Sequence, residues 1–325
     1  MFRLMIQKLK KNPKKIVFTE GEDPRILEAA ARLLSGTFLT PILIGDPEKI
    51  YKVADEECLN VKGVTILQPH TYDKMDEMAA KMVELRKGKM TPEQCREALQ
   101  QGNYFGTMLV AMKEADCLLG GATYSTADTV RPALQLIKTK PGNKIVSSCF
   151  ILVRPFATGG NQVLAMGDCA INIDPTEDDL VEITQEVAAC ARRFGADPKV
   201  AMLSYSTMGS GAGPMVDKMR NACKKLQGMD LDFPVDGEFQ FDAAVSPTVG
   251  KLKAPKSSVA GRANTFIFPD ISSGNIGYKI AQRMGNFDAY GPILLGLNAP
   301  INDLSRGCNA LEVYSMSIIT AALAD

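Results

Sequence analysis

Hydrophobic and polar positions alternate with two different periods along the first part of the chain. Apolar runs at 15–19 and 41–45 are short, which predicts buried strands. Between them the apolar positions of 26–34 recur with helical spacing, and Asp23 followed by Pro24 is typical of a helix cap and first helical residue. Strands that alternate with helices indicate a parallel sheet.

Three further helical patterns, at 73–87, 91–100 and 103–114, lead to a buried strand at 115–121 that contains the pair Gly120-Gly121. A glycine pair either lets a ligand approach backbone amides or forms a tight turn, and both interpretations stay open. The next helix begins with a capping signal, because Ser125 precedes Asp128 by three residues.

The pattern changes near residue 144. We expect strands at 145–152 and 162–166 joined by a turn at Gly159-Gly160-Asn161, because this is the pattern of a β-hairpin. A long helix over 176–194 follows, capped by Thr176. Since 325 residues exceed what one hydrophobic core usually organises, we interpret the hairpin as the entry to a second domain.

A glycine-rich loop stands between a strand at 200–207 and a helix that runs through Leu226. Its first residues are Gly209, Ser210 and Gly211. Flexible glycines that expose amides beside a helix N-terminus are typical of a phosphate-binding loop. Small residues also permit close packing of strand and helix, so the sequence leaves both interpretations open.

Three polar loops, at 236–242, 270–275 and 302–306, come after predicted strands, and we expect them to share one rim of a sheet. The last of them begins a stretch that carries Ser305, Arg306 and, slightly further on, the carboxylate of Glu312.

An apolar strand at 291–297 precedes this stretch, and a terminal helix with apolar positions from Leu311 onwards follows it. A polar loop in that position is where open α/β sheets bind ligands. A solvated loop without chemistry is the alternative.

Composition removes several classes of function. Lysine plus arginine equals aspartate plus glutamate, 37 each, so no global positive field exists to attract nucleic acid or an anionic membrane. No apolar run has the length of a spanning helix, and the first residues lack the core of a signal peptide. The 8 cysteines are scattered singly, as in a reduced, cytoplasmic protein.

The single histidine, His70, restricts the chemistry further. No metal site built on several histidines is possible, no cysteine cluster replaces it, and neither a GxSxG elbow nor a Walker A sequence is present. Arginines, carboxylates, hydroxyls and amides must therefore carry any reaction. Arg25 lies in a first helical turn, where a cation opposes the helix dipole, and this suggests an anionic ligand. Arg86, by contrast, matches an ordinary basic helix end.

Several stretches of the second half, with two upstream, resemble the phosphate acetyltransferases, of which the phosphate butyryltransferases are close relatives. The downstream stretches are Val259-Ala260-Gly261-Arg262-Ala263-Asn264, Phe268-Pro269-Asp270, Gly274-Asn275-Ile276-Gly277-Tyr278-Lys279, Gly291-Pro292-Ile293-Leu294 and Asn302-Asp303-Leu304-Ser305-Arg306-Gly307-Cys308. The upstream stretches are Glu20-Gly21-Glu22-Asp23-Pro24-Arg25 and Met202-Leu203-Ser204-Tyr205-Ser206-Thr207.

This resemblance implies a fold of two α/β domains with mainly parallel sheets around an interdomain cleft, similar to the isocitrate and isopropylmalate dehydrogenases. Residues 1–145 and 297–325 would form the first domain and residues 146–296 the second. It also implies a homodimer without prosthetic group. The implied reaction converts acetyl-CoA and phosphate into acetyl phosphate and CoA by direct thiolate attack in a ternary complex.

The resemblance also implies roles for individual residues. Ser305 would steady the oxyanion or thiol, Arg306 would hold the phosphate or acetyl phosphate, and Glu312 would be the base. Arg86 and Arg131 match the family's CoA-binding arginines, which replaces the structural interpretation of Arg86.

Arg25 and Arg283 fall at other arginine positions of the family's cleft, and the loop Gly209–Gly211 is a further candidate for phosphate. A covalent intermediate on Cys308 is the mechanistic alternative, although only His70 could assist it.

Two departures from the family pattern bear on these expectations. Glu312 stands where an aspartate is common, and Met208 stands where many relatives carry a lysine. Because Asn309 suits the N-cap of the last helix, Glu312 could instead complete a capping box. Two other classes also stay open, namely a non-catalytic domain that senses acetyl-CoA and a metal- and nicotinamide-dependent dehydrogenase of similar fold.

Overall fold

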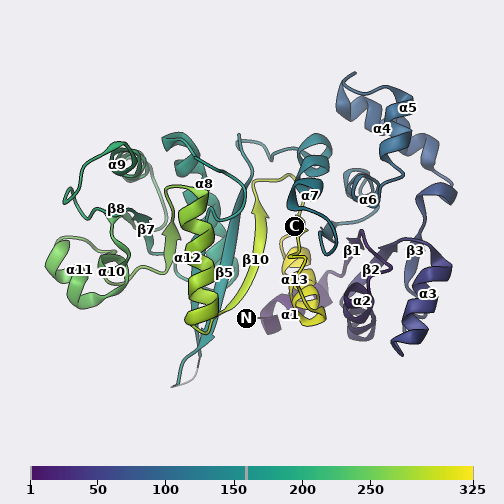
Figure 1. Ribbon diagram of the computed structural model, residues 1–325, viewed down its shortest axis with the longest axis horizontal. Helices are drawn as coiled ribbons and strands as arrows, with labels where there is room; N and C mark the ends of the chain where they lie inside the picture. Colours follow the sequence, from purple (N-terminus) through teal and green to yellow (C-terminus); the bar gives the residue numbers. More distant parts are fainter. Residues whose placement is uncertain (1, 158–159, 325) are drawn as a thin grey trace. The chain divides into compact units, whose positions relative to one another are not determined.

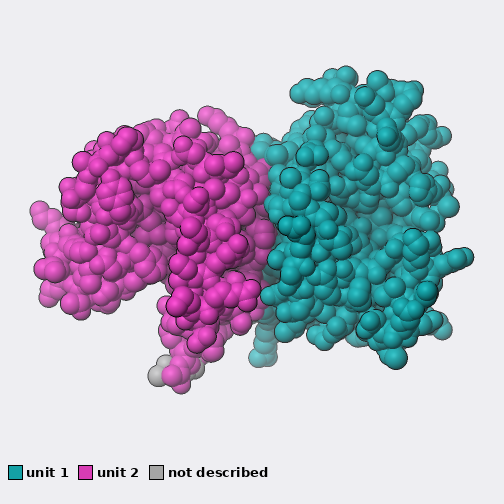
Figure 2. Space-filling model, viewed as in Figure 1, with its two compact units in different colours: residues 1–142, 297–325 teal, residues 143–296 magenta. Residues whose placement is uncertain are grey.

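The structure, a computed structural model, describes residues 2–157 and 160–324. The chain forms two compact units, residues 1–142 with 297–325 and residues 143–296, which Figure 2 colours separately. The sequence placed the first of these boundaries at residue 145. The expected α/β class with two mainly parallel sheets is confirmed.

Unit 1 contains the following elements in chain order (Figure 1). They are α1 Phe2–Lys11, β1 Lys14–Phe18, α2 Pro24–Gly36, β2 Leu39–Ile44, α3 Pro47–Glu56, β3 Thr65–Leu67, η1 Pro69–Thr71, α4 Met75–Arg86, α5 Pro92–Ala98, α6 Gly102–Ala111, β4 Cys117–Gly120, α7 Thr126–Pro132, η2 Ala133–Ile137, β11 Ile301–Asp303 and α13 Ala310–Ala322.

The sheet of unit 1 has the order β11-β4-β1-β2-β3, and all of its neighbouring strands are parallel. The chain moves outward from β1 through β2 to β3, and then returns to the other side of β1 with β4 and β11. The point where this direction reverses lies between β1 and β4. Ligands of open α/β sheets bind outside the carboxyl ends of the strands at such a switch point.

Helices cover both faces of this sheet, which explains why its strands are apolar on both sides. Val17 of β1 belongs to a core cluster with Phe105 and Met108 of α6. On the same strand Ile16 and Phe18 are fully buried, and they face the opposite side because side chains alternate along a strand. Helices α1, α2 and α13 pack against one another, and α13 also contacts β1 and β4.

Unit 2 contains the remaining elements (Figure 1). They are β5 Ser147–Pro155, β6 Asn161–Gly167, α8 Glu177–Arg193, β7 Val200–Leu203, α9 Pro214–Gln227, β8 Val235–Phe239, α10 Phe241–Val245, α11 Pro247–Lys253, β9 Thr265–Ile267, α12 Ile271–Met284 and β10 Asp288–Leu295.

The sheet of unit 2 has the order β10-β5-β6-β9-β7-β8, with antiparallel pairs at the β10 end and parallel pairs from β6 onwards. The hairpin of β5 and β6 confirms the expected pair of strands, while Gly159 of its expected turn lies outside the described residues. Helix α12 packs on β5 through Tyr278, whose ring stacks on Phe150 at 3.8 Å between centroids.

The predicted helix caps at Asp23 and Thr176 are confirmed, whereas the predicted cap at Ser125 is wrong. Asp23 accepts the backbone N–H of Arg25 and caps α2, and Thr176 begins α8 within a complete capping box. The Ser125 hydroxyl donates to Asp128 at 2.7 Å but does not cap α7. Among the described residues no helix is both long and apolar enough to cross a membrane.

Three expectations about the second half are wrong. The loops at 236–242 and 270–275 follow strands of unit 2, whereas the loop at 302–306 follows β11 of unit 1, so they do not share one rim. The predicted strand at 291–297 belongs to the sheet of unit 2 and does not lead directly into the Ser305 loop. The sequence pattern of 259–270 also indicates a strand that ends in Pro269-Asp270, and only Thr265–Ile267 of it forms one.

The strand that precedes the loop, β11, carries Asn302 and Asp303, which are buried polar residues and therefore hide it from a search for apolar runs. Leu311, expected on the apolar face of the last helix, is 60% exposed.

Candidate active site

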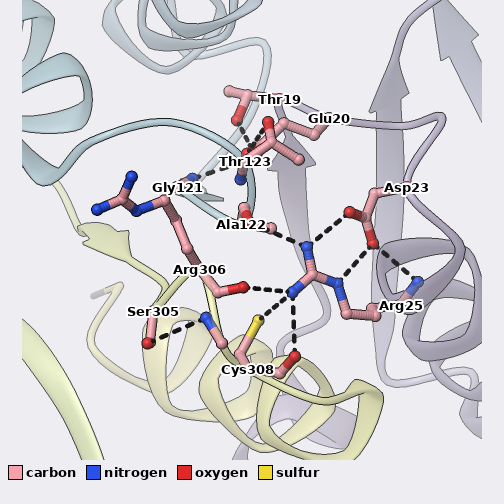
Figure 3. A network of polar contacts seen from close by, with 11 residues as sticks. Thr19, Glu20, Asp23, Arg25, Gly121, Ala122, Thr123, Ser305, Arg306 and Cys308 are labelled. Atoms are coloured by element: carbon pink, nitrogen blue, oxygen red, sulfur yellow. Dashed lines mark hydrogen bonds and ion pairs between the residues drawn. The ribbon is translucent and has the colours of Figure 1, made fainter.

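Three loops meet at the switch point of unit 1, and each begins where a parallel strand ends. They follow β1, β4 and β11, which are neighbours in the sheet, so their carboxyl ends lie at one edge. Figure 3 shows that residues of all three loops surround the guanidinium of Arg25, several of them through backbone carbonyls. This edge carries the candidate catalytic residues Ser305 and Arg306.

Arg25 lies in the first turn of α2. All five N–H groups of its guanidinium donate hydrogen bonds to the chain. Its Nε and Nη2 donate to the two oxygens of Asp23 at 2.9 and 2.7 Å. Nη2 also donates to the carbonyl of Ala122 at 3.0 Å. Nη1 donates to the carbonyls of Arg306 at 2.9 Å and Cys308 at 3.1 Å. Asp23 is therefore the carboxylate that pairs with Arg25 in this structure.

Glu20, just after β1, ties the loop after β4 to the same edge. Its carboxylate accepts the backbone N–H groups of Gly121 at 3.1 Å and Thr123 at 2.7 Å. It also accepts the hydroxyls of Thr19 and Thr123. Sequence reasoning placed Glu20 in a family stretch and gave it no role; an acid directly after a buried strand was the available signal.

Asp303, at the end of β11, ties the third loop to α7. It is 1% exposed and accepts the hydroxyls of Thr126 and Thr129, each at 2.6 Å. Burial raises the pKa of Asp303 to about 6, although the two hydroxyls lower it. A Cβ on Gly121 would lie 2.1 Å from the Asp303 carboxylate, and Gly121 has a φ of +94°. The glycine pair thus makes room for an internal side chain.

Ser305 and Arg306 are exposed to solvent in the loop after β11. The Ser305 hydroxyl accepts the backbone N–H of Gly307 at 3.3 Å, which leaves its own proton available to a ligand. The Arg306 guanidinium makes no hydrogen bond or ion pair within the described residues, and Figure 3 shows it extending away from Arg25. Five charged donors are therefore open to an anion at this position.

Cys308 and Glu312 follow on the same segment. Burial raises the pKa of the Cys308 thiol to about 11, so it is a poor nucleophile. The Cys308 sulfur accepts from Arg25 at 3.7 Å and has no contact with His70 among the described residues. Glu312 forms the capping box at the start of α13: its carboxylate accepts the Asn309 N–H at 2.9 Å, and Asn309 accepts the Glu312 N–H at 2.9 Å.

The two arginines expected to bind CoA both lie in unit 1. Arg131 is exposed on α7, the helix that Asp303 anchors, and makes no ion pair within the described part of the chain. Arg86 is half-buried at the end of α4, and its Nε points to the thioether of Met90 at 3.3 Å. Neither guanidinium uses all five of its N–H donors within the described residues, in contrast with that of Arg25.

The glycine-rich loop lies in unit 2 and already holds an anion. The N–H of Gly209 donates to Glu238 at 2.8 Å, and the N–H of Gly211 donates to Ser206 at 2.9 Å. Glu238 is 1% exposed and paired with Arg220 at 3.1 Å. The Ser210 hydroxyl accepts the backbone N–H of Thr207 within the same loop. A buried carboxylate therefore occupies the position in which the sequence suggested a phosphate.

Arg283, the last of the predicted cleft residues, is exposed in the final turn of α12 in unit 2. Its charge lowers the pKa of Tyr278 one turn earlier, although burial dominates and raises that pKa overall.

A pocket of about 790 Å³ adjoins the loops after β1 and β2 in unit 1. Glu20, Glu22, Asp23 and Asp46 line it together with Lys49 and His70. Its carboxylates repel phosphate, so we do not assign the anion site here. Within the described residues no cluster of three or more His, Cys, Asp or Glu side chains is arranged to hold a metal ion.

Comparisons with known proteins agree with this architecture. The family model described as "Phosphate acetyl/butaryl transferase" matches residues 1–321. A phosphate acetyltransferase of Bacillus subtilis is 51% identical over 324 residues, which cover 100% of this chain and 99% of the relative.

Two solved structures are also similar over nearly their whole length. A phosphotransacetylase from Streptococcus pyogenes has a TM-score of 0.92 and 50% identity, covering 100% of this chain and 99% of that one. The EutD phosphotransacetylase from Staphylococcus aureus has a TM-score of 0.91 and 47% identity, covering 100% and 98%.

The fold, the loop after β11 and these likenesses together define an acyltransferase built from two α/β units. The chain belongs to the phosphate acetyl/butyryl transferase family.

The buried Asp303 gives a pH-dependent prediction. Its folded-state pKa of about 6 lies above the ordinary value of 3.8, so the folded state binds the proton more tightly than the unfolded state. This contribution to stability is present at low pH and is lost as the pH rises through about 6. The Asp303→Asn variant cannot titrate there.

From pH 8 to pH 4 the free energy of unfolding of the wild type should therefore rise relative to that of Asp303→Asn by about 2.4 kcal/mol. Urea titrations of both proteins at several pH values measure this difference. A difference that does not change with pH would contradict the assignment.

Proposed function

We propose that this protein is a phosphate acetyltransferase, which transfers an acetyl group reversibly between CoA and inorganic phosphate. The observation that carries the proposal is the Arg306 guanidinium, which has no partner among the described residues, beside the Ser305 hydroxyl at the switch point of a family member. The relatives and solved structures named above are phosphate acetyltransferases or phosphotransacetylases, which favours acetyl over butyryl as the acyl group.

Arg306 would bind the phosphate group of acetyl phosphate. A guanidinium offers parallel N–H donors that match two phosphate oxygens, and such charge-assisted bonds are the strong ones. The Ser305 hydroxyl would donate to the carbonyl oxygen as that oxygen becomes negative in the transition state. The chain has equal numbers of positive and negative side chains, so this local arginine supplies the attraction for the anion.

The CoA thiol needs a base, because a thiol with a reference pKa of about 8.5 is mostly protonated at neutral pH. We assign this role to Glu312, whose carboxylate oxygen Oε2 accepts the Asn309 N–H while Oε1 has no partner among the described residues. The thiolate sulfur then bonds to the acetyl carbon, the bond from that carbon to the phosphate oxygen breaks, and phosphate leaves with the electron pair. Cys308 takes no part in this direct transfer.

Arg131 and Arg86 would bind the phosphates of CoA. Both guanidinium groups belong to helices of unit 1 and have N–H donors without a partner among the described residues. Arg131 is exposed two residues beyond Thr129, one of the threonines that hold Asp303. Arg283 of unit 2 is retained as a further candidate for contact with the substrates. Because the reactants themselves carry the acetyl group and the thiol, we propose no prosthetic group and no metal.

We further propose a cytoplasmic homodimer that binds neither nucleic acid nor membrane. Helix α12 carries an exposed apolar stripe of Ile276, Ile280 and Met284, which are 58%, 54% and 82% exposed and four residues apart. Such a stripe favours contact with another protein surface. Sedimentation that finds only single chains would contradict the dimer.

The wild-type protein provides the first test. Mixed with acetyl phosphate and CoA, it should form acetyl-CoA at a rate that follows protein concentration, read as thioester absorbance, and butyryl phosphate should react more slowly. A faster reaction with butyryl phosphate would assign the other acyl group of the family. Binding of CoA without turnover of either acyl phosphate would leave the role of a non-catalytic sensor and refute the proposal.

The Glu312→Gln variant separates the base from the cap. Glutamine also completes capping boxes, so the free energy of unfolding should change little. Loss of a general base should lower kcat by about 10²–10⁴-fold. Steady-state kinetics and thermal unfolding of the same sample measure both quantities. Near-normal turnover would show that Glu312 only caps α13, whereas an equal loss of stability and activity would show that the variant disturbs the loop.

A further inference from the structure

We propose that Arg25 is a positioning residue for the loop Ser305–Cys308, held in place by Asp23, and that it does not bind substrate. This inference rests on the proposed function, because it assigns Arg25 a role in that same site. It departs from the sequence-based expectation, in which Arg25 was one of several phosphate-binding arginines.

Arg25 has no side-chain donor left for a substrate. A guanidinium has five N–H donors and no acceptor. All five of Arg25 are directed at oxygens of the chain, at 2.7 to 3.1 Å. A phosphate could bind Arg25 only by displacing one of these partners. The Arg306 side chain has no partner among the described residues, so an anion that reaches this edge meets better donors on Arg306 in the loop after β11.

The partners themselves show what Arg25 does. Two are carboxylate oxygens of Asp23 in its own loop, one is the carbonyl of Ala122 in the loop after β4, and two are the carbonyls of Arg306 and Cys308 in the loop after β11. One side chain therefore bridges all three loops of the switch point (Figure 3). The Arg306 carbonyl belongs to the residue whose side chain should bind phosphate, so the direction of that side chain depends on this bond.

Asp23 fixes the bridge. Its side chain is only 11% exposed, against 27% for Arg25, and it grips Arg25 through both oxygens. The same carboxylate accepts the Arg25 backbone N–H at 2.9 Å, so it is anchored to the start of α2. The hydrogen bond to Asp23 is the main reason why the pKa of Arg25 is raised. The pair thus fixes the loop Ser305–Cys308, which is distant in the sequence, to the start of α2.

Two conservative variants test the proposal. Arg25→Lys keeps the charge, but an ammonium has three donors and cannot form the planar fork to Asp23. Asp23→Asn keeps a good N-cap for α2 but loses the charge and one of the two oxygens. Arg32→Lys, an exposed arginine of the same helix paired with Glu28, is the matched control.

If Arg25 positions the loop, Arg25→Lys and Asp23→Asn should both lower kcat by roughly ten- to a hundredfold, the loss expected for one or two charged hydrogen bonds. The KM for acetyl phosphate should change by less than about threefold, because Arg306 still provides the donors. Combined in one chain, the two changes should lower kcat little further than either alone, since both remove the same bridge. Arg32→Lys should behave as the wild type.

Hydrogen exchange provides a readout that does not depend on activity. The amides of Leu304 and Cys308 are hydrogen-bonded within this edge, to the carbonyls of Gly120 and Ser305. In Arg25→Lys and Asp23→Asn these amides should exchange about tenfold faster, while those of α8 in unit 2 keep their rates. Circular dichroism confirms that each variant is folded.

The outcomes separate the proposal from its premise. A raised KM for acetyl phosphate with unchanged kcat and unchanged exchange would show that Arg25 binds substrate, and would overturn the inference. Unchanged kcat with unchanged exchange would also overturn it. If the wild type itself transfers no acyl group, the proposed function fails, and faster exchange in both variants would still establish the bridge, whereas unchanged exchange would refute it.

Discussion

The saturated guanidinium of Arg25 is the constraint on which the candidate active site depends. It lies where the strand order of unit 1 reverses direction, between β1 and β4. At this position no loop connects the two strands across their carboxyl ends. Three separate loops have to be held at this edge, and none of them has regular secondary structure to hold it. One planar group with five directed donors joins them, supported by Glu20 and Asp303 on either side.

The number of donors that the chain itself uses distinguishes arginines that hold the structure from arginines that can bind a ligand. Arg25 is satisfied internally and lies beside a carboxylate, so its charge is neutralised locally. Arg306 and Arg131 are exposed and without partners among the described residues, so their charge is available to an anion. The glycine-rich loop of unit 2 illustrates the same principle with backbone amides, because the buried Glu238 accepts the N–H of Gly209 and the Ser206 hydroxyl accepts that of Gly211. Whether a donor can bind substrate depends on what else satisfies it.

Sequence patterns predicted the features that depend on neighbouring residues. The caps at Asp23, Thr176 and Asn309 were found because N-cap chemistry operates within four residues. The short strand β11 was missed because Asn302 and Asp303 interrupt its apolar run, and their partners lie on α13 and α7. The bridge from Arg25 to the Arg306 carbonyl spans 281 positions of the chain, and no local pattern predicts such a contact. The roles of Glu20 and Asp303 were missed for the same reason.

The division of the arginines is tested most directly by comparing the two substrates in two variants. Arg306→Gln and Arg131→Gln each remove one open guanidinium, and initial rates with varied acetyl phosphate and varied CoA give both KM values for each protein. The account predicts that Arg306→Gln raises the KM for acetyl phosphate and Arg131→Gln the KM for CoA, each by roughly ten- to a hundredfold, with little effect on the other substrate. Equal increases for both substrates in both variants would contradict it.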